Sequence, residues 1–237
     1  MKVLVIPDVH LKPNMFFEAS ALMHQKIADK AVCLMDIADD WNQEYNVDLY
    51  EETYDAAIKF ALDYPESLWC YGNHDLSYLW QQLESGYSSM ASATVQKKLF
   101  ELKCSLPQNN SMMYVQRIDN VVFSHGGILD SFVKVNVSSS QYDNVDDAID
   151  AINQLGENEM WSDSSPIWLR PQYSEMSMFR PQELLQVVGH TPVESISKDG
   201  NIISCDVFST YRNGDPIGTE EFLVLDTVTW EFMGIKH

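Results

Sequence analysis

Short apolar runs alternate with segments of helical spacing over the first hundred residues. The run KVLVIP, from Lys2 to Pro7, is continuous and rich in β-formers, which is typical of a buried strand. Two further strands are predicted at residues 31–35 and 67–71. The helices are expected over residues 14–30, 47–64, 76–83 and 90–103. This alternation predicts parallel strands joined by helical crossovers.

The pattern changes in the second half of the chain. Residues 112–127 predict a hairpin that turns at Asp119-Asn120, and residues 145–155 predict a short acidic helix. Further strands are expected within residues 184–190, 201–208, 221–226 and 229–235, with turns at 198–201 and 226–227. We therefore expect more antiparallel sheet here. The fold class predicted for both halves is α/β, a two-sheet β-sandwich flanked by helices, with residues 1–237 as a single domain.

Polar side chains follow several of these apolar runs directly. They are Asp8 and His10, then Asp36, Asp39 and Asp40, then Asn73, His74 and Asp75, and finally His125 and His190. Ligands of open α/β sheets bind at the carboxyl ends of strands. One such cluster on its own is explained by a turn, a helix cap or a structural histidine. Their recurrence at five strand ends favours one shared site.

The residue types in these clusters suit a pair of metal ions. Asp8 and His10 are two apart on an extended chain, so both side chains are expected to face one metal. Asp36 has two carboxylate oxygens and can bridge two cations. The second metal is completed by Asn73, His125 and His190. Carboxylate with imidazole suits Mn, Fe, Zn, Co or Ni, of which we favour Mn. Such a pair clamps a phosphate and activates a water.

His74 follows Asn73 directly, and on extended backbone the two side chains point to opposite sides. If Asn73 is a ligand, His74 faces the substrate and is suited to protonate a leaving alkoxide. An imidazole in that role needs a partner that fixes its tautomer, and Asp39 is our candidate.

The ordered motifs resemble those of the calcineurin-like metallophosphoesterase superfamily. The motifs are Asp8-x-His10, Asp36-x-x-Asp39, Gly72-Asn73-His74-Asp75, His125-Gly126-Gly127 and Gly189-His190. The resemblance implies a sandwich of two sheets with a dinuclear site at the strand ends. It implies the same ligands, namely Asp8, His10, Asp36, Asn73, His125 and His190. It also implies an acid dyad of His74 and Asp39.

The last motif indicates which branch of the superfamily the chain resembles. Many members carry Gly-His-x-His, but here Pro192 takes the place of the second histidine. Together with SHGG, this is similar to the serine/threonine protein phosphatase and diadenosine-tetraphosphatase branch. In that branch an arginine before Gly-His binds the phosphate, and Arg170 is the matching position. A planar guanidinium that contacts two phosphate oxygens fits that role.

Several positions depart from the pattern of the branch. Asp40 and Tyr71 replace arginines of the phosphate clamp, and Asp75 replaces a glutamate. Pro7 and Leu11 stand where glycines are usual. These changes put protein phosphatase activity in question. The cations that remain for a phosphate are Arg170, Lys12, Arg180 and Arg212.

Composition restricts partners and location. The formal net charge is −20, which argues against nucleic acid as a passive partner. There is no apolar run of about 18 residues, so no membrane span is expected. The apolar stretch at the N-terminus is too short for a signal peptide. The four cysteines lack metal-like or disulfide-like spacing, which favours the cytoplasm.

The favoured hypothesis is a metal-dependent phosphoesterase that hydrolyses a phosphate ester through an activated water. Its substrate is a phosphoprotein, a nucleotide or a small molecule. A dinucleoside polyphosphate hydrolase is one alternative. The other is a non-catalytic binding module of the same fold, which Asp40 favours and the retained pair of His74 and Asp39 opposes.

Overall fold

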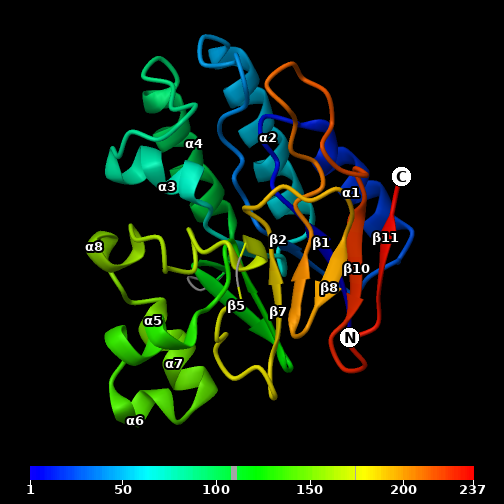
Figure 1. The fold of residues 1–237 in the computed structure, drawn as a ribbon. Coiled ribbons are helices and arrows are strands. Elements are labelled where there is room, and N and C mark those ends of the chain that lie inside the picture. The colour runs from blue at the N-terminus through cyan, green and yellow to red at the C-terminus, as the bar shows by residue number, and fades with distance from the viewer. Residues whose placement is uncertain (108–110, 174) are drawn as a thin grey trace.

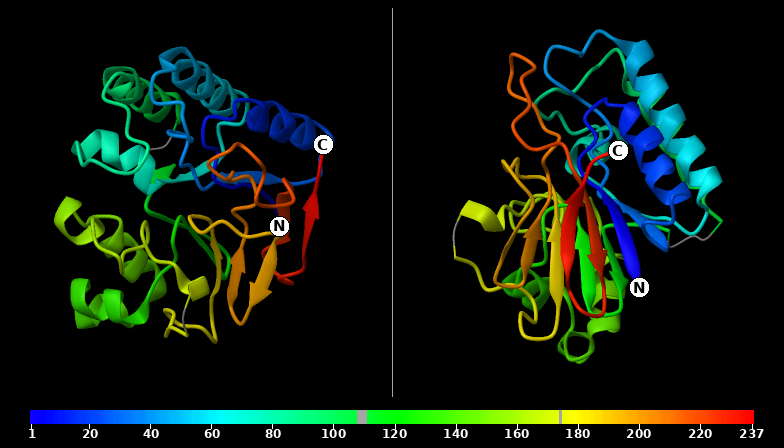
Figure 2. Two further views of the ribbon diagram at one scale, coloured as in Figure 1. Left: turned by 45° about the horizontal axis from the view of Figure 1, so that its top comes forward. Right: turned by 90° about the vertical axis from the view of Figure 1, so that its right-hand side faces the viewer.

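The computed structural model describes residues 1–107, 111–173 and 175–237. Two β-sheets face each other at its centre, and helices lie on the outer faces of both (Figures 1 and 2). The predicted α/β sandwich flanked by helices is therefore confirmed.

The first sheet contains the amino-terminal strands. Within the described residues its order is β11-β10-β1-β2-β3-β4. The bounds are β1 (Lys2–Ile6), β2 (Lys30–Cys33), β3 (Leu68–Cys70), β4 (Met112–Met113), β10 (Phe222–Asp226) and β11 (Phe232–Ile235). Strands β1 to β3 pair in parallel, as their helical crossovers predicted. Strand β4 also pairs in parallel with β3, so its residues belong to this sheet and not to the hairpin in which they were expected. The carboxy-terminal hairpin completes the sheet, because β10 pairs antiparallel to β1 with Lys2 opposite Asp226.

The second sheet has the order β5-β6-β7-β9-β8 in the described chain. The bounds are β5 (Val115–Ile118), β6 (Val121–Ser124), β7 (Leu185–Val188), β8 (Ser197–Asp199) and β9 (Ile202–Ser204). The predicted hairpin at Asp119-Asn120 is confirmed, and β8 and β9 form another. The expectation of antiparallel pairing is only partly right, because β6, β7 and β9 are parallel neighbours. Their carboxyl ends therefore reach the same edge of the sheet.

The helices differ from prediction mainly at their ends. Their bounds are α1 (Asn14–His24), α2 (Val47–Asp63), α3 (Asn73–Trp80), α4 (Ser92–Ser105), α5 (Asp130–Asn136), α6 (Ser139–Tyr142), α7 (Val145–Ile152) and α8 (Glu157–Met160), with a 3₁₀ turn η1 (Pro171–Tyr173). Helix α1 ends before Lys26, whose positive φ of 57° cannot continue a helix. Helices α5, α6 and α8 are too short for their periodicity to show in the sequence, and were not predicted.

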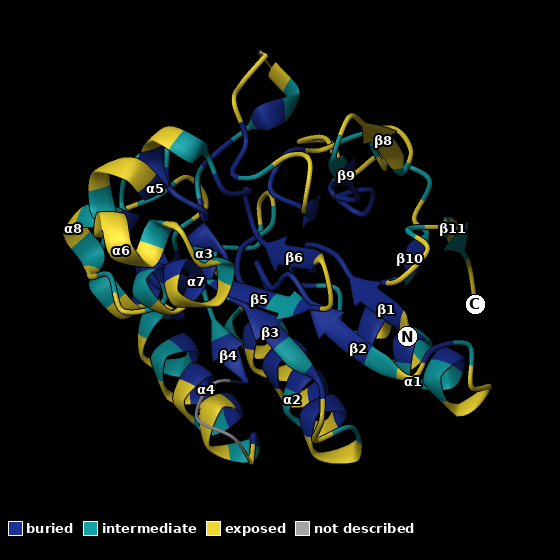
Figure 3. Cartoon of the chain, turned by 90° about the horizontal axis from the view of Figure 1, so that it is seen from below, coloured by how far each residue is buried: buried dark blue, intermediate teal, exposed yellow. Residues whose placement is uncertain are grey.

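Apolar clusters lie between the layers. Alternate residues of β1 serve two of them: Leu4 packs in the cluster of α1, α2 and α4, and Val5 packs against the second sheet. On the far side of that sheet, Val122 packs with Val133 of α5 and Ile149 of α7. Figure 3 shows central strands such as β1, β2 and β6 buried beside helices whose outer sides are exposed, while β8 at the edge of the second sheet is exposed. These clusters fix the strand ends relative to one another.

A search of the described helices for one both long enough and apolar enough to cross a membrane found none.

Candidate metal centre

Polar residues that follow the strands of both sheets lie close together. Asp8 follows β1, Asp36 follows β2 and Asn73 follows β3 in the first sheet, while His125 follows β6 and His190 follows β7 in the second. All five side chains are buried, with exposed fractions from 0% to 6%. Buried polar groups in such number need partners.

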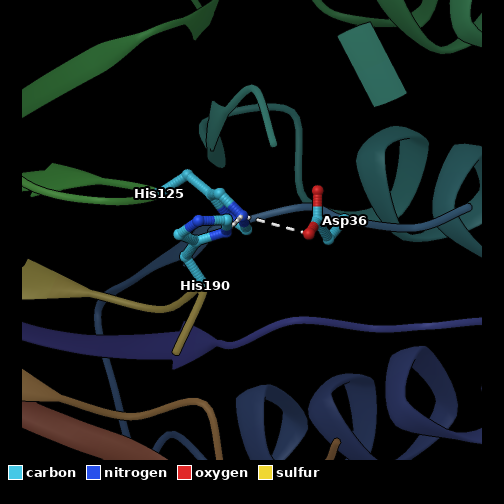
Figure 4. Close-up of side chains that lie close together, drawn as sticks. All are labelled: Asp36, His125 and His190. Carbon is cyan, nitrogen blue, oxygen red and sulfur yellow. Dashed lines mark hydrogen bonds and ion pairs between the residues drawn. The ribbon is translucent and has the colours of Figure 1, made fainter. Parts of the chain in front are cut away.

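Two groups of donor atoms meet at this point. Asp36, His125 and His190 bring ligand atoms within 4.8 Å of one another, and so do Asp8, His10 and Asp36. Asp36 belongs to both groups. Figure 4 shows its carboxylate facing the two imidazoles of the first group. Five of the six residues predicted to hold metals thus lie in two groups that share the carboxylate of Asp36.

His125 lies at the centre of the first group. Its Nδ1–H donates to the carbonyl oxygen of Leu34 at 3.0 Å, which turns Nε2 into the cluster. Nε2 lies 3.0 Å from Oδ2 of Asp36, 3.0 Å from Oδ1 of Asn73 and 3.1 Å from Nδ1 of His190. This is an imidazole oriented for a ligand, with an amide oxygen, a carboxylate and a second imidazole around the same point.

The backbone at the site differs from the extended chain assumed above. His10 has a φ of 42°, Asp36 of 41° and His190 of 62°, all in the left-handed region. Each costs about 1–3 kcal/mol, a strain that clusters at functional sites. Placing Asp8 and His10 on extended chain was therefore wrong. Asn73 and His74 are likewise the first residues of α3, and their side chains diverge because they are neighbours on a helix.

The donor set fits divalent cations. Oδ2 of Asp8 and Nε2 of His190 are buried and have no hydrogen-bond partner among the described residues. Both atoms are metal-ligating types, and mixed carboxylate and imidazole donors suit first-row transition metals. The site therefore has the composition and the unpaired atoms expected of a metal centre.

The charged groups at the site shift one another's pKa values. Burial opposes ionisation of Asp36, but His125, His74 and His10 outweigh it and hold its pKa well below the usual range. Burial alone would lower the pKa of His125, but Asp36 and Asp8 raise it to about 9. Burial keeps the pKa of His190 low.

Two glycines lie against the carboxylates. A Cβ at Gly72 would lie 2.0 Å from Oδ1 of Asp36, and a Cβ at Gly189 would lie 2.0 Å from Oδ2 of Asp8. Asp8 is also held by the backbone N–H of His190, which donates to its Oδ1 at 2.7 Å. The absent side chains let both carboxylates rest directly on the backbone.

We expect Gly72→Ala and Gly189→Ala each to weaken Mn²⁺ binding about 10–100-fold, because displacing a ligand from its support has effects of that size. Calorimetric titration of metal-free protein measures this. Gly156→Ala is the matched control, since the nearest atom to its Cβ is 3.4 Å away on the side chain of Glu159. Wild-type affinity in Gly72→Ala would contradict the assigned role of Asp36.

His74 and Asp39 form the expected pair. Nδ1 of His74 lies 2.9 Å from Oδ2 of Asp39, and the other oxygen of Asp39 accepts from the hydroxyls of Tyr50 and Tyr78. Burial lowers the pKa of His74, but Asp36 and Asp39 raise it to about 9. His74 is therefore held protonated at neutral pH. Tyr50 and Tyr78 were missed, because each sits on an ordinary helix with no local signal of a site.

A cavity of about 230 Å³ opens at this centre. Its lining includes His10, Asp36, Asp39, His74, Arg170, His190 and Asp206. Nη1 of Arg170 donates to the carbonyl oxygen of His190 at 2.7 Å, which holds the guanidinium beside the group formed by Asp36, His125 and His190. Arg170 therefore lines the cavity next to His190.

The other cations that the sequence offered are not among the described residues that line this cavity, although Lys12 and Arg212 contact residues that do. Arg180 pairs with Glu183 and donates to the carbonyl oxygen of Tyr142, outside the lining of the cavity. Arg212 lies over the ring of Trp41 at 5.7 Å. Lys12 lies 3.4 Å from Asp40.

Asp40 is used to join two loops. Its Oδ1 accepts from the Thr210 hydroxyl at 3.1 Å and its Oδ2 faces Lys12, while the indole N–H of Trp41 donates to the carbonyl oxygen of Thr210. These bonds tie the loop after β2 to residues 209–217 and build one wall of the cavity. Asp40 therefore has partners in the protein instead of presenting a bare charge to a phosphate.

The other two replacements also have structural partners. Tyr71 packs against Tyr114 with ring centroids 5.8 Å apart. Asp75 accepts from the hydroxyl of Tyr54 at 2.7 Å and from the backbone N–H of Ile37 at 3.1 Å. Asp75 thereby holds the loop that carries Asp36.

Asp206 is a further cavity residue that sequence reasoning missed. It follows β9, it is 1% exposed, and its Oδ2 accepts from the hydroxyl of Ser209 at 3.0 Å. Burial raises its pKa. A carboxylate after the apolar run Ile202 to Cys205 was the available signal, but residues 201–208 were interpreted as one continuous strand.

Comparison with known proteins agrees with this geometry. The family model described as calcineurin-like phosphoesterase matches residues 1–217. A crystal structure of a cold-active protein-tyrosine phosphatase from a psychrophilic Shewanella is similar with a TM-score of 0.60 and 20% identity, covering 99% of this chain and 80% of that one. A hypothetical protein from Pyrococcus horikoshii gives 0.50 and 13%, covering 99% and 87%. Both likenesses are in fold. The search of curated proteins gave no match.

Proposed function

We propose that this chain, which belongs to the calcineurin-like phosphoesterase family, is a dinuclear phosphomonoesterase. Membership of the family confirms the resemblance seen in the motifs and makes the chain a hydrolase of phosphate ester bonds. The family uses divalent metals, and the candidate ligand groups of this chain suit them. The dinuclear mechanism and the substrate are the proposal.

The observation that carries the proposal is the sharing of Asp36 between two ligand groups. We assign Asp8, His10 and Asp36 to one cation, and Asp36, Asn73, His125 and His190 to the other. Mn²⁺ is the first choice. Two such ions would activate a water for attack on phosphorus and neutralise phosphate charge.

The remaining cavity residues have separate roles. His74, held in its tautomer by Asp39, donates a proton to the leaving oxygen of the ester. Arg170 contacts the non-bridging phosphate oxygens through the part of its guanidinium not bonded to His190. No side chain is assigned as a nucleophile, so no covalent phosphoenzyme is expected.

The cavity favours a monoester with one organic group. It holds about 230 Å³, and Trp41, Pro192 and Ile217 give it an apolar wall next to the metal centre. A phosphorylated side chain of a protein, or a small phosphorylated molecule, matches this size better than a dinucleoside polyphosphate does. That a solved structure of the same fold is a protein-tyrosine phosphatase is consistent with this choice.

The test pairs elemental analysis with a substrate panel. The panel holds an aryl monoester, an aryl diester, a phosphopeptide and diadenosine tetraphosphate, each with added Mn²⁺. We expect about two metals per chain and preference for the monoesters. Two metals without turnover of any member would favour the binding module. Absence of bound metal would overturn the proposal.

Arg170→Gln is expected to lower kcat/KM for an aryl phosphate about 10–100-fold, because a hydrogen bond to a charged group contributes about 1.5–3 kcal/mol. Steady-state kinetics at fixed Mn²⁺ measures the loss. Arg180→Gln is the matched control, since Arg180 pairs with Glu183 outside the cavity lining. Equal effects of the two substitutions would argue against phosphate binding by Arg170.

A single domain over residues 1–237 and a cytoplasmic location stay predictions. So does the absence of nucleic-acid binding, which rests on the net charge of −20.

A further inference from the structure

Asp206 occupies a strand end like those of the assigned ligands. Strand β9 is the parallel neighbour of β7, with Val188 opposite Ser204. Three adjacent parallel strands, β6, β7 and β9, therefore end at His125, His190 and Asp206 along one edge. The carboxylate of Asp206 is buried and lines the same cavity as His10 and Asp36.

The groups that compensate the charge of Asp206 are Ser209 and the nearby imidazoles of His10 and His125. Its partners are the hydroxyl of Ser209 at 3.0 Å and the backbone N–H of Ser209 at 3.3 Å. No lysine or arginine in the described residues forms an ion pair with it, and its charge acts directly on Asp8 and His10. A buried carboxylate beside other carboxylates is unfavourable unless a cation compensates it.

Asp206 also stands on the side of the centre that has fewer donors. The backbone N–H of Val193 donates to the carbonyl oxygen of Asp206 at 2.8 Å, which places Asp206 beside Pro192. Pro192 lines the cavity but has no side-chain donor atom for a metal. The carboxylate of Asp206 lines the same cavity as His10 and Asp36 of this group, and its charge acts on Asp8 and His10.

We propose that Asp206 is an acidic residue of the metal centre, whose charge raises the affinity of the Asp8, His10 and Asp36 group for a divalent cation. Among the described residues, Asp206 lies outside both groups that bring ligand atoms within 4.8 Å, so it acts through its charge. This inference rests on the proposed metal-dependent function.

The substitution Asp206→Asn tests the effect of the negative charge without changing the size of the side chain. The amide keeps the size of the side chain and an oxygen that accepts from Ser209, but it removes the negative charge. Ser209→Ala is the matched control, because it removes the hydroxyl bond and leaves the carboxylate. Metal-free wild type and both variants are titrated with Mn²⁺ by calorimetry. We expect one of two sites to weaken about 10–100-fold in Asp206→Asn, and both to be kept in Ser209→Ala.

Thermal unfolding with and without Mn²⁺ gives a second readout. A ligand stabilises the folded state by an amount that grows with the logarithm of its affinity, so the Mn²⁺-induced rise in Tm should be smaller in Asp206→Asn. The Tm of the metal-free variant should equal or exceed that of wild type, because a buried charge is gone. A purely structural residue would lower that Tm and leave the affinities intact.

The outcomes distinguish a failure of this inference from a failure of the proposed function. Two sites in wild type and two unchanged sites in Asp206→Asn would overturn this inference and leave the proposed function standing. No Mn²⁺ binding by wild type would overturn both.

Discussion

Replacement of Asp36 by asparagine is expected to remove both metals together and to lower kcat/KM at least about 10³-fold. Metal ions contribute several kcal/mol to catalysis of this kind, and each 1.36 kcal/mol is a factor of ten. Asp36 is the residue common to both ligand groups. Its Oδ1 also accepts the backbone N–H of His74 at 3.0 Å, while Oδ2 lies 3.0 Å from His125.

The asparagine is nearly isosteric but has one acceptor oxygen instead of two. Whichever way the amide turns, either the contact with the backbone N–H of His74 or the contact with His125 is lost. Metal content after dialysis against Mn²⁺, together with turnover of an aryl phosphate, measures the effect. Asp40→Asn is the control, since Asp40 lines the same cavity but belongs to neither group. Two metals retained in Asp36→Asn would show that Asp36 is not the shared ligand.

The strand ends of this protein could be found from sequence because their signal is local. An apolar run followed at once by Asp, Asn or His marks both the strand and the place where it ends. Parallel strands bring such ends together without any knowledge of the loops. That is why Asp8, Asp36, Asn73, His125 and His190 could be gathered before the structure was known.

The features that were missed depend on contacts between distant segments. The pairing of β10 with β1 joins residues from opposite ends of the chain, and nothing in either run specifies the other. Tyr50 and Tyr78 reach Asp39 from two different helices. Asp206 was hidden because one carboxylate in a strand-like run also fits an ordinary exposed position.

The local backbone conformation at the site was also not predicted from the sequence. His10 was expected on extended chain and instead turns through a positive φ, which the surrounding packing imposes against the preference of the residue. The side chains of the predicted ligands lie close together despite this error, because the loops that carry them turn back toward the same point. Residue choice therefore specified which side chains meet, and tertiary packing specified how.

His74→Asn is expected to lower kcat about 10²–10⁴-fold for an alkyl phosphate, the range for loss of a general acid. The loss should be much smaller for an aryl phosphate with a good leaving group, because that oxygen departs without a proton. Metal content should stay at the wild-type value, since His74 belongs to neither ligand group. His24→Asn, at an exposed histidine near the end of α1, is the matched control.

The dependence on leaving group distinguishes two roles for His74. As proton donor, it matters in proportion to the basicity of the departing oxygen, so the two esters respond differently. As a residue that only positions phosphate or supports Asp39, it would affect both esters equally. Equal losses would therefore remove His74 from the chemical step while leaving the metal centre intact. Because Nδ1 is bonded to Asp39, Nε2 is the atom left to carry the proton, and the alkyl ester is the substrate that reveals it.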